Sequence, residues 1–258
     1  MITLSLILAA GAALQAQEPP KEWGKREWGS DTEMLRKGEN PSMHYAAEQA
    51  TCPVCSAKIR VAGMGLSYSS RGKDLDFKTS EYVSANPYLF ALWMCPECSY
   101  AAKAEDFEKK VDPEKIKAAL GKTSRYDSYF DIPYSALLRR AEQCYGLREF
   151  SDEDWGWLYL YGAWVARDSK EAEAEREYHK KAQAKFVIVS EKGKGNARAA
   201  AAYLVGEIYR RQGERAKAVD WLAKAEKISE EVKSKNIPSW IKVCREEMDK
   251  PQKDEKGK

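Results

Sequence analysis

The chain has 258 residues, of which 43% are hydrophobic, so it is long enough for one large or two modest domains with ordinary cores. Aromatic residues make up 11% of it, which argues against a wholly disordered protein. Basic and acidic residues nearly balance, 43 against 40, and the net charge of +3 is too small to indicate a nucleic-acid-binding or membrane-binding surface. We therefore expect the charges to lie on solvated helix faces.

The N-terminus, MITLSLILAAGAALQA, differs in composition from the rest of the chain. It carries no charged side chain and is apolar from Ile2 to Leu14, which is the length of a signal-peptide core and too short to span a bilayer comfortably. No Lys or Arg precedes the apolar run, so an uncleaved anchor or a misassigned start are alternatives. The segment predicts a signal peptide at 1–16 with cleavage after Ala16. The mature protein would then be periplasmic or secreted and free of the membrane.

Residues 17–45 are rich in Pro, Gly and charge, and are predicted to form a linker with a short helix near Thr32–Lys37. Trp23 and Trp28 are unusual in a free linker. Because a large aromatic side chain usually contributes buried area, we expect both to dock on the folded part rather than to recognise a ligand.

Residues 46–110 contain two cysteine pairs and are predicted to form a small β module. KIRVAG at 58–63 and YLFALWM at 88–94 are apolar or β-branched runs bounded by Gly, Asn and Pro, as strands are. GLSYSSRGKDLDF at 65–77 is predicted to be a polar loop. AKAEDFEKKV at 102–111 follows the second pair and is predicted to be a short helix.

Residues 111–248 are predicted to be helical. DPEKIKAAL begins with Asp112 as the N-cap and a proline in the first turn, and Gly121 ends it. Apolar residues recur at i, i+3, i+4 and i+7 over 134–145, which indicates an amphipathic helix. Ser151, followed by three acidic residues, marks the start of the next helix, and a further long helix is predicted after it.

The segment AYLVGEIYRRQGERAKAVDWLAKAEKIS resembles a tetratricopeptide repeat. Gly206, Tyr209 and Ala218 match the pattern of that family, whereas Ala202 stands where the family has Trp. Small side chains at Gly206 and Ala218 would let two antiparallel helices approach closely, and Gly213 would turn the chain between them.

The tetratricopeptide resemblance implies an inner groove lined by side chains of the first helix. Here these would be Tyr203, Glu207, Arg210 and Arg211. We predict a protein or peptide partner for this surface, and the alternative is that the helices only pack as a bundle. The helices at 151–190 could be a degenerate and stretched partner repeat, in which Gly162 takes the place of Gly206.

Cysteine is concentrated in two similar stretches, TCPVCS at 51–56 and MCPECS at 94–99. Two Cys-x-x-Cys units separated by a strand-and-loop segment are typical of a four-thiolate zinc ribbon, because each turn points both sulfurs to one side and two turns complete a tetrahedron. We predict one structural Zn²⁺ and no catalytic metal. Its ligands would be Cys52, Cys55, Cys95 and Cys98.

The order CPVC, RGKDLDF and NPYLFALWMCPECSYAAKAEDF resembles an uncharacterised bacterial family that joins a two-knuckle zinc ribbon to a helical-repeat tail. The matching positions are Arg71, Asp74, Asp76, Asn86, Pro87, Tyr100, Ala101 and Phe107. The resemblance implies this architecture and no particular activity. Ser56 and Ser99 replace the glycine usual after each pair, where a positive φ is convenient. The resemblance also implies a cytoplasmic protein, in contrast to the predicted export.

Export leaves other states open for the four cysteines. In an oxidising compartment they could form two disulfides, within or across the pairs. Cys-Pro-x-Cys also resembles the redox motif of thioredoxin-like proteins, although no βαβ pattern surrounds either copy here. Haem attachment is excluded because Ser, not His, follows each pair.

The remaining cysteines and the histidines are weaker candidates. Cys144 and Cys244 lie on apolar helical faces and are predicted to be buried as small hydrophobic side chains, with a disulfide between them as the alternative. His44 could be a spare metal ligand. His179 is predicted to lie on a solvated face.

Two aspartates in the predicted polar loop, Asp74 and Asp76, flank Leu75. They could hold a cation or a substrate. We predict instead that they pair with Arg71 or cap the loop.

These observations predict a mainly α protein with a small β zinc ribbon. The ribbon module would occupy 46–110, a tetratricopeptide-like helical domain 111–248, and a disordered charged tail 249–258. With two histidines and no nucleophile–base pair in view, we predict a non-enzymatic scaffold that contacts a protein partner. The alternative is an exported thiol–disulfide oxidoreductase or a disulfide-stapled structural protein.

Overall fold

The computed structural model describes residues 21–26, 31–40, 45–64, 70–82, 86–121 and 126–250. The predicted leader, Trp28, His44 and the end of the predicted tail lie outside these ranges, and the side chain of Arg71 is not described. Within the described ranges, no helix is both long and apolar enough to cross a membrane.

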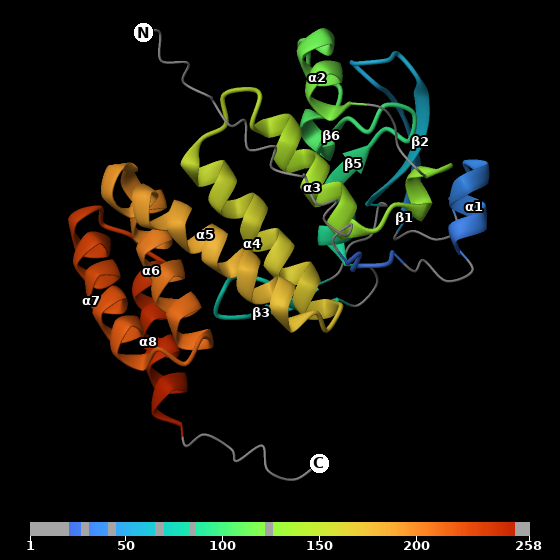
Figure 1. Ribbon diagram of the computed structural model, residues 1–258. Helices are drawn as coiled ribbons and strands as arrows, with labels where there is room; N and C mark the ends of the chain where they lie inside the picture. The colour runs from blue at the N-terminus through green and yellow to red at the C-terminus, as the bar shows by residue number, and fades with distance from the viewer. Residues whose placement is uncertain are drawn as a thin grey trace, which may run out of the picture.

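The protein is mainly helical, with short antiparallel strand pairs near its N-terminal end (Figure 1). The strand pairs are β1 Tyr45–Thr51 with β2 Lys58–Met64, β3 Ser70–Lys73 with β4 Thr79–Tyr82, and β5 Leu92–Met94 with β6 Ala101–Lys103. The helices are α1 Asp31–Lys37, α2 Pro113–Leu120, α3 Tyr134–Tyr145, α4 Asp152–Asp168, α5 Ala172–Lys192, α6 Gly195–Arg211, α7 Arg215–Glu231 and α8 Ile237–Asp249. The short helix α1 and the strand β2 confirm two of the predicted elements.

Each cysteine pair forms the turn of a hairpin, and β1–β2 and β5–β6 are called here the two cysteine hairpins. Thr51 pairs with Lys58 at the base of the first turn, and Met94 pairs with Ala101 at the base of the second. Each Cys-x-x-Cys turn is therefore closed by two antiparallel, hydrogen-bonded strands. This pairing fixes the backbone of the turn and hence the directions of its cysteine side chains.

The strand predicted over 88–94 is only partly correct. Residues Pro87–Phe90 form a 3-10 turn instead, because the Asn86 side chain accepts a hydrogen bond from the Tyr88 amide (3.0 Å) and proline starts the turn. Only the last three residues join the sheet as β5.

Two further local predictions were wrong. The polar loop at 65–77 contains β3, which pairs with β4 across the turn 74–78, although the run has few of the apolar residues that mark a strand. The helix predicted over 102–111 is β6 followed by the 3-10 turn Ala104–Asp106. Pairing with β5 overrides the local helix propensity there, and the Lys103 amide donates to the Tyr145 hydroxyl (2.9 Å).

The helix boundaries follow the predicted caps. The Asp112 carboxylate accepts from the amides at the start of α2, and Gly121 ends it at φ 63°. At α4 the Ser151 hydroxyl accepts from the Asp154 amide (3.1 Å). Side-chain oxygens satisfy amides that have no partner inside the helix, so short polar motifs determine where these helices begin.

Helices α4–α8 pack as successive antiparallel neighbours, coloured from yellow to red in Figure 1. Glycines allow the closest approaches. A Cβ at Gly162 would lie 2.5 Å from Leu138 Cδ2, and one at Gly206 would lie 3.1 Å from Leu222. Gly213, at φ 77°, turns the chain between α6 and α7. The predicted close packing at Gly206 is therefore confirmed.

Two hydrophobic clusters make up the core of the described residues. One joins the cysteine hairpins to α2, α3 and part of α4, and the other joins α4 to α8. The first cluster crosses the domain boundary predicted between residues 110 and 111, so α3 shares its core with the cysteine hairpins. Trp23 packs against this cluster, with its ring 5.8 Å from that of Tyr178, which confirms its predicted docking.

Cys144 and Cys244 are fully buried, as predicted, and each is a free thiol. They belong to different clusters, Cys144 to the first and Cys244 to the second. Each therefore fills space as a small hydrophobic side chain.

Candidate metal centre and buried ion network

The tips of the two cysteine hairpins bring four sulfur atoms together. The Sγ atoms of the four predicted ligands all lie within 4.8 Å of one another. Across the hairpins, Cys52 Sγ is 3.5 Å from Cys98 Sγ, and Cys55 Sγ is 3.6 Å from Cys95 Sγ. All four are free thiols. The convergence predicted from the Cys-x-x-Cys spacing is thus confirmed.

The two turns have the same hydrogen-bond pattern. The Ser56 amide donates to the Cys52 carbonyl (2.9 Å), and the Ser99 amide donates to the Cys95 carbonyl (2.9 Å). Both serines have φ 62°, the left-handed conformation in which glycine is favoured. The serines therefore adopt the glycine geometry at a cost of about 1–2 kcal/mol each, which the surrounding turn must offset.

The four sulfurs differ in exposure. Cys52 and Cys95 are buried, Cys98 is half-buried and Cys55 is exposed. Hydrogen bonds from Cys95 and Cys98 lower the pKa of Cys52, and the contact with Cys52 is the largest cause that raises the pKa of Cys95 and of Cys98. The contacts within the cluster therefore favour one thiolate and disfavour further ionisation around it.

The donor set fits a soft divalent cation. A cation at the centre would remove the repulsion between thiolates and allow all four to ionise. Four sulfur ligands on two rigid turns match a tetrahedral thiolate site, and a site filled by four protein ligands leaves no open position for a substrate. Such a centre would hold the two hairpins together and would not be catalytic.

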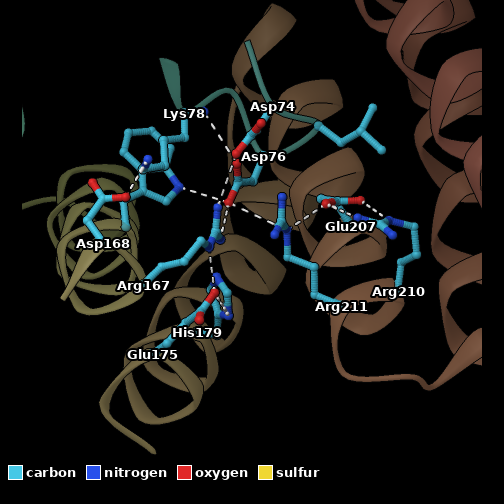
Figure 2. Close-up of polar contacts among 12 residues, drawn as sticks. Asp74, Asp76, Lys78, Arg167, Asp168, Glu175, His179, Glu207, Arg210 and Arg211 are labelled. Carbon is cyan, nitrogen blue, oxygen red and sulfur yellow. Dashed lines mark hydrogen bonds and ion pairs between the residues drawn. The ribbon is translucent and has the colours of Figure 1, made fainter. Parts of the chain in front are cut away.

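A second group of charged side chains lies where the turn 74–78 meets the helices (Figure 2). Asp76 is 0% exposed and accepts hydrogen bonds from Arg167 Nη2 (2.6 Å) and Trp164 Nε1 (3.0 Å), while Arg211 Nε lies 3.6 Å away. Asp74 accepts from Arg167 Nη1 (3.4 Å). The two aspartates pair with arginines of α4 and α6, which the sequence did not predict, and the predicted pairing with Arg71 lies outside the described side chains.

Charge pairing decides the ionisation of Asp76. Burial acts to raise its pKa, but Arg211 and Arg167 outweigh burial, and the net pKa lies below the usual value. Asp76 is therefore a buried carboxylate held in its charged form by two guanidinium groups.

The four side chains predicted to line a groove lie beside this network. Tyr203 and Glu207 are both 0% exposed, and Arg210 and Arg211 are half-buried. Glu207 accepts from Arg210 Nε (2.6 Å), Arg211 Nε (2.7 Å) and Cys244 Sγ (3.4 Å). The structure thus brings all four together, and the chain's own turn 74–78 contacts two of them, Tyr203 and Arg211. A partner-binding role for them stays a prediction.

The position predicted for His179 was wrong. The side chain is 3% exposed and packs inside the ion network, with Nδ1 4.0 Å from Glu175 Oε1. Burial, followed by the positive charge of Arg167, lowers its pKa to about 4. Helix α5 is highly charged, so its apolar stripe is narrow. The sequence pattern therefore did not show that His179, like Tyr178, is buried.

The buried imidazole predicts a specific acid sensitivity. Between pH 6.5 and about 4 the unfolded chain binds a proton at His179 that the folded chain does not bind, so the free energy of unfolding falls as the pH is lowered. The loss should reach about 3 kcal/mol at most. We expect His179→Gln to remove most of this loss in urea unfolding curves measured from pH 7.5 to 4. His44→Gln, which changes the other histidine, should keep the wild-type slope, and an unchanged slope in His179→Gln would contradict the assignment.

Comparison with known proteins identifies one family. The family model described as "Uncharacterized protein conserved in bacteria (DUF2225)" matches residues 45–250. No curated protein and no solved structure matches the chain. The matched range begins at β1 and ends just after α8, so it contains both cysteine hairpins and the helices that carry the ion network.

Proposed function

The chain belongs to this uncharacterised bacterial family, DUF2225, and we propose that its four clustered cysteines hold one structural Zn²⁺ in a non-enzymatic protein-interaction scaffold. The observation that carries the proposal is the convergence of four sulfur atoms within 4.8 Å on two turns of matching geometry. Zinc is favoured among soft cations because it accepts four thiolates in a tetrahedron and has no redox chemistry of its own.

A structural role follows from the surroundings of the cluster. The two cysteine hairpins form separate two-stranded sheets, and each is a pair of short strands. An isolated two-stranded hairpin is at best marginally stable in water. Metal binding at the tips would add its free energy to the stability that packing against α3 supplies.

The helical part supplies the contact surface in this proposal. The packing of α6 on α7, with Gly206 against Leu222 and with Ala218 fully buried, supports a tetratricopeptide-like unit. Helical repeats of this kind present side chains of successive first helices to a protein or peptide partner. Nucleic acid is not proposed, because the net charge is only +3.

The alternative function is thiol–disulfide exchange in an exported protein. It is retained because Cys55 is exposed, as an attacking thiol has to be. The predicted leader, if cleaved, would place the mature protein in the periplasm or outside the cell, where such chemistry occurs.

The deciding experiment measures zinc and thiols on the same sample. Residues 17–258 would be purified without chelator from the compartment in which the native protein resides. We expect one zinc per chain, and four additional reactive thiols when the metal is removed. A preparation without metal, in which those four thiols are absent until reductant is added, would overturn the zinc site and favour disulfides. The mass of the native protein reports in addition whether cleavage follows Ala16.

A further inference from the structure

Two close sulfur contacts cross from one cysteine hairpin to the other. Cys55 Sγ lies 3.6 Å from Cys95 Sγ, and Cys98 Sγ lies 3.5 Å from Cys52 Sγ. In each contact one residue is accessible to solvent and the other is not, because Cys55 is exposed and Cys98 is half-buried, whereas Cys95 and Cys52 are buried. The cluster therefore consists of two cross-hairpin pairs, each with one accessible and one buried thiol.

The backbone and the core hold these sulfurs in place. The Cys52 amide donates to the Ala57 carbonyl (2.9 Å), and the Cys95 amide donates to the Tyr100 carbonyl (2.8 Å), so backbone hydrogen bonds close each turn. Both buried cysteines also belong to the hydrophobic cluster that joins the hairpins to α3. We therefore expect the cross-hairpin contacts to persist when no ion lies between the sulfurs.

An accessible thiolate beside a second thiolate is the arrangement that oxidation by a peroxide requires. The first thiolate attacks a peroxide oxygen and becomes a sulfenic acid, which then condenses with the second thiolate to form a disulfide. With hydrogen peroxide, each disulfide consumes two thiolates, one H₂O₂ and two protons, and releases two water molecules. The two electrons pass from the sulfurs to the peroxide oxygens. A sulfur in a disulfide is no longer a thiolate, which is the form that binds a metal.

We propose that the four cysteines form a peroxide-sensitive switch in which Cys55 is oxidised first and Cys95 condenses with it. The two thiolates that remain, Cys98 and Cys52, no longer form a four-sulfur site and release the ion. They then form the second disulfide in the same way, with the more accessible Cys98 attacking the peroxide. The substrate is a small peroxide, because the attacking sulfurs lie at the tips of the hairpins and their partners are buried.

The switch replaces one link between the hairpins with another. Zinc would join the hairpins in the reduced chain, and the Cys55–Cys95 and Cys52–Cys98 disulfides would join them after oxidation. The hairpins thus stay connected in both states. This inference rests on the proposed function, because the zinc-loaded chain is the resting state and conversion requires peroxide.

The test adds hydrogen peroxide to the reduced, zinc-loaded chain and follows zinc and disulfides in the same sample. A chromogenic zinc chelator reports release relative to a sample without peroxide, and tryptic peptides are mapped by mass spectrometry without reductant. Trypsin leaves each cysteine pair in a peptide of its own, residues 38–58 and 79–103, so only disulfides across the hairpins join the two peptides. We expect the joined peptides to appear as one zinc per chain is released.

The order of oxidation is read after one molecule of peroxide per chain. Cleavage after Glu97 separates Cys95 from Cys98, and fragmentation of the linked peptides assigns the partner of each. We expect Cys55–Cys95 to be the predominant linkage at this stage. Cys144 is fully buried outside the sulfur cluster, so Cys144→Ser is the matched control and should give the same zinc release and the same linkages.

Reversal distinguishes a switch from oxidative damage. Dithiothreitol followed by zinc should restore the original zinc content and the four thiols, because disulfides are reducible whereas sulfinic and sulfonic acids are not. Failure to recover zinc, with sulfinic or sulfonic acids at these cysteines, would overturn the proposal.

Three other results would also overturn it. They are disulfides within each pair, which leave the two tryptic peptides separate, a first disulfide that lacks Cys55, and a zinc content that millimolar peroxide does not change. A reduced chain that binds no zinc would refute the metal site of the proposed function by itself. The same peptide map of that metal-free chain would still decide whether the disulfides cross the hairpins.

Discussion

Cys95→Ser is expected to abolish metal binding and to destabilise the cysteine hairpins by about 5 kcal/mol or more. The reason is that a structural zinc site contributes roughly 10–16 kcal/mol in small zinc-dependent domains, and removal of one buried ligand leaves three thiolates without a complete tetrahedron. Here the hairpins share a core with α3, which retains part of the packing when the metal is lost. The measurement is thermal unfolding with and without a strong chelator.

Cys144→Ser is the matched control for this prediction. Both Cys95 and Cys144 are fully buried in the same hydrophobic cluster, and both substitutions replace a sulfur with a hydroxyl. Cys144 lies outside the sulfur cluster and accepts a contact from the Ala101 amide (3.5 Å). Its replacement should cost about 1–3 kcal/mol for burying a hydroxyl, with the response to chelator unchanged.

The pair of variants separates a metal site from ordinary packing. Stabilisation by a bound ion grows with its concentration relative to its dissociation constant, so only a chain with a complete site loses stability when a chelator is added. Cys95→Ser should therefore melt at the same temperature with or without chelator. Equal chelator responses in both variants would show that the four sulfurs do not hold a structural metal.

The local part of this architecture could be predicted from the sequence. The Cys-x-x-Cys turns, the Asp112 cap of α2 and the Ser151 cap of α4 are each decided by residues within a few positions of one another. The burial of Cys144 is a similar case, because Cys144 lies on the apolar face that the i, i+3, i+4 spacing of hydrophobic residues predicts for α3. At these positions the pattern and the structure agree, whereas in the run 88–94 the equally local Asn86 cap produced a 3-10 turn in place of the predicted strand.

The ion network could not be predicted in the same way. Trp164 and Asp76 are 88 positions apart in the sequence, and Tyr203 is 128 positions from Leu75. No periodicity connects such residues, and the turn between β3 and β4 has the polar composition of an exposed loop. The sequence does place a charged and an aromatic residue, Asp76 and Phe77, next to each other in a predicted loop, which is a weak sign that the loop is not simply exposed. Their partners on α4, α6 and α8 are known only from the tertiary packing.

Asp76→Asn is expected to destabilise the protein by about 3–5 kcal/mol at pH 7, because removal of one partner from a buried ion pair leaves the other charge uncompensated. Here Arg167 would keep Glu175 (2.7 Å) as a partner, and Arg211 would keep Glu207 (2.7 Å), which places the cost nearer the lower end. Urea unfolding at pH 7 measures it.

Asp74→Asn is the control in the same turn. Asp74 has one contact with Arg167 at 3.4 Å and is about one third exposed, and partly exposed ion pairs contribute about 0–1 kcal/mol. The two variants alter the turn by the same isosteric change, so a difference between them reports the buried charge. Equal costs would mean that the burial of Asp76 contributes nothing specific.

The pH dependence gives the Asp76 prediction an independent check. Because the folded-state pKa of Asp76 is depressed, its contribution is present above the unfolded-state pKa and is lost as the pH falls through the folded-state value. The difference in unfolding free energy between wild type and Asp76→Asn should therefore be largest near neutral pH and shrink at strongly acidic pH. A difference that stays constant to pH 2 would assign the cost to packing of the amide, and the turn 74–78 would then be held on α6 and α8 by its apolar contacts alone.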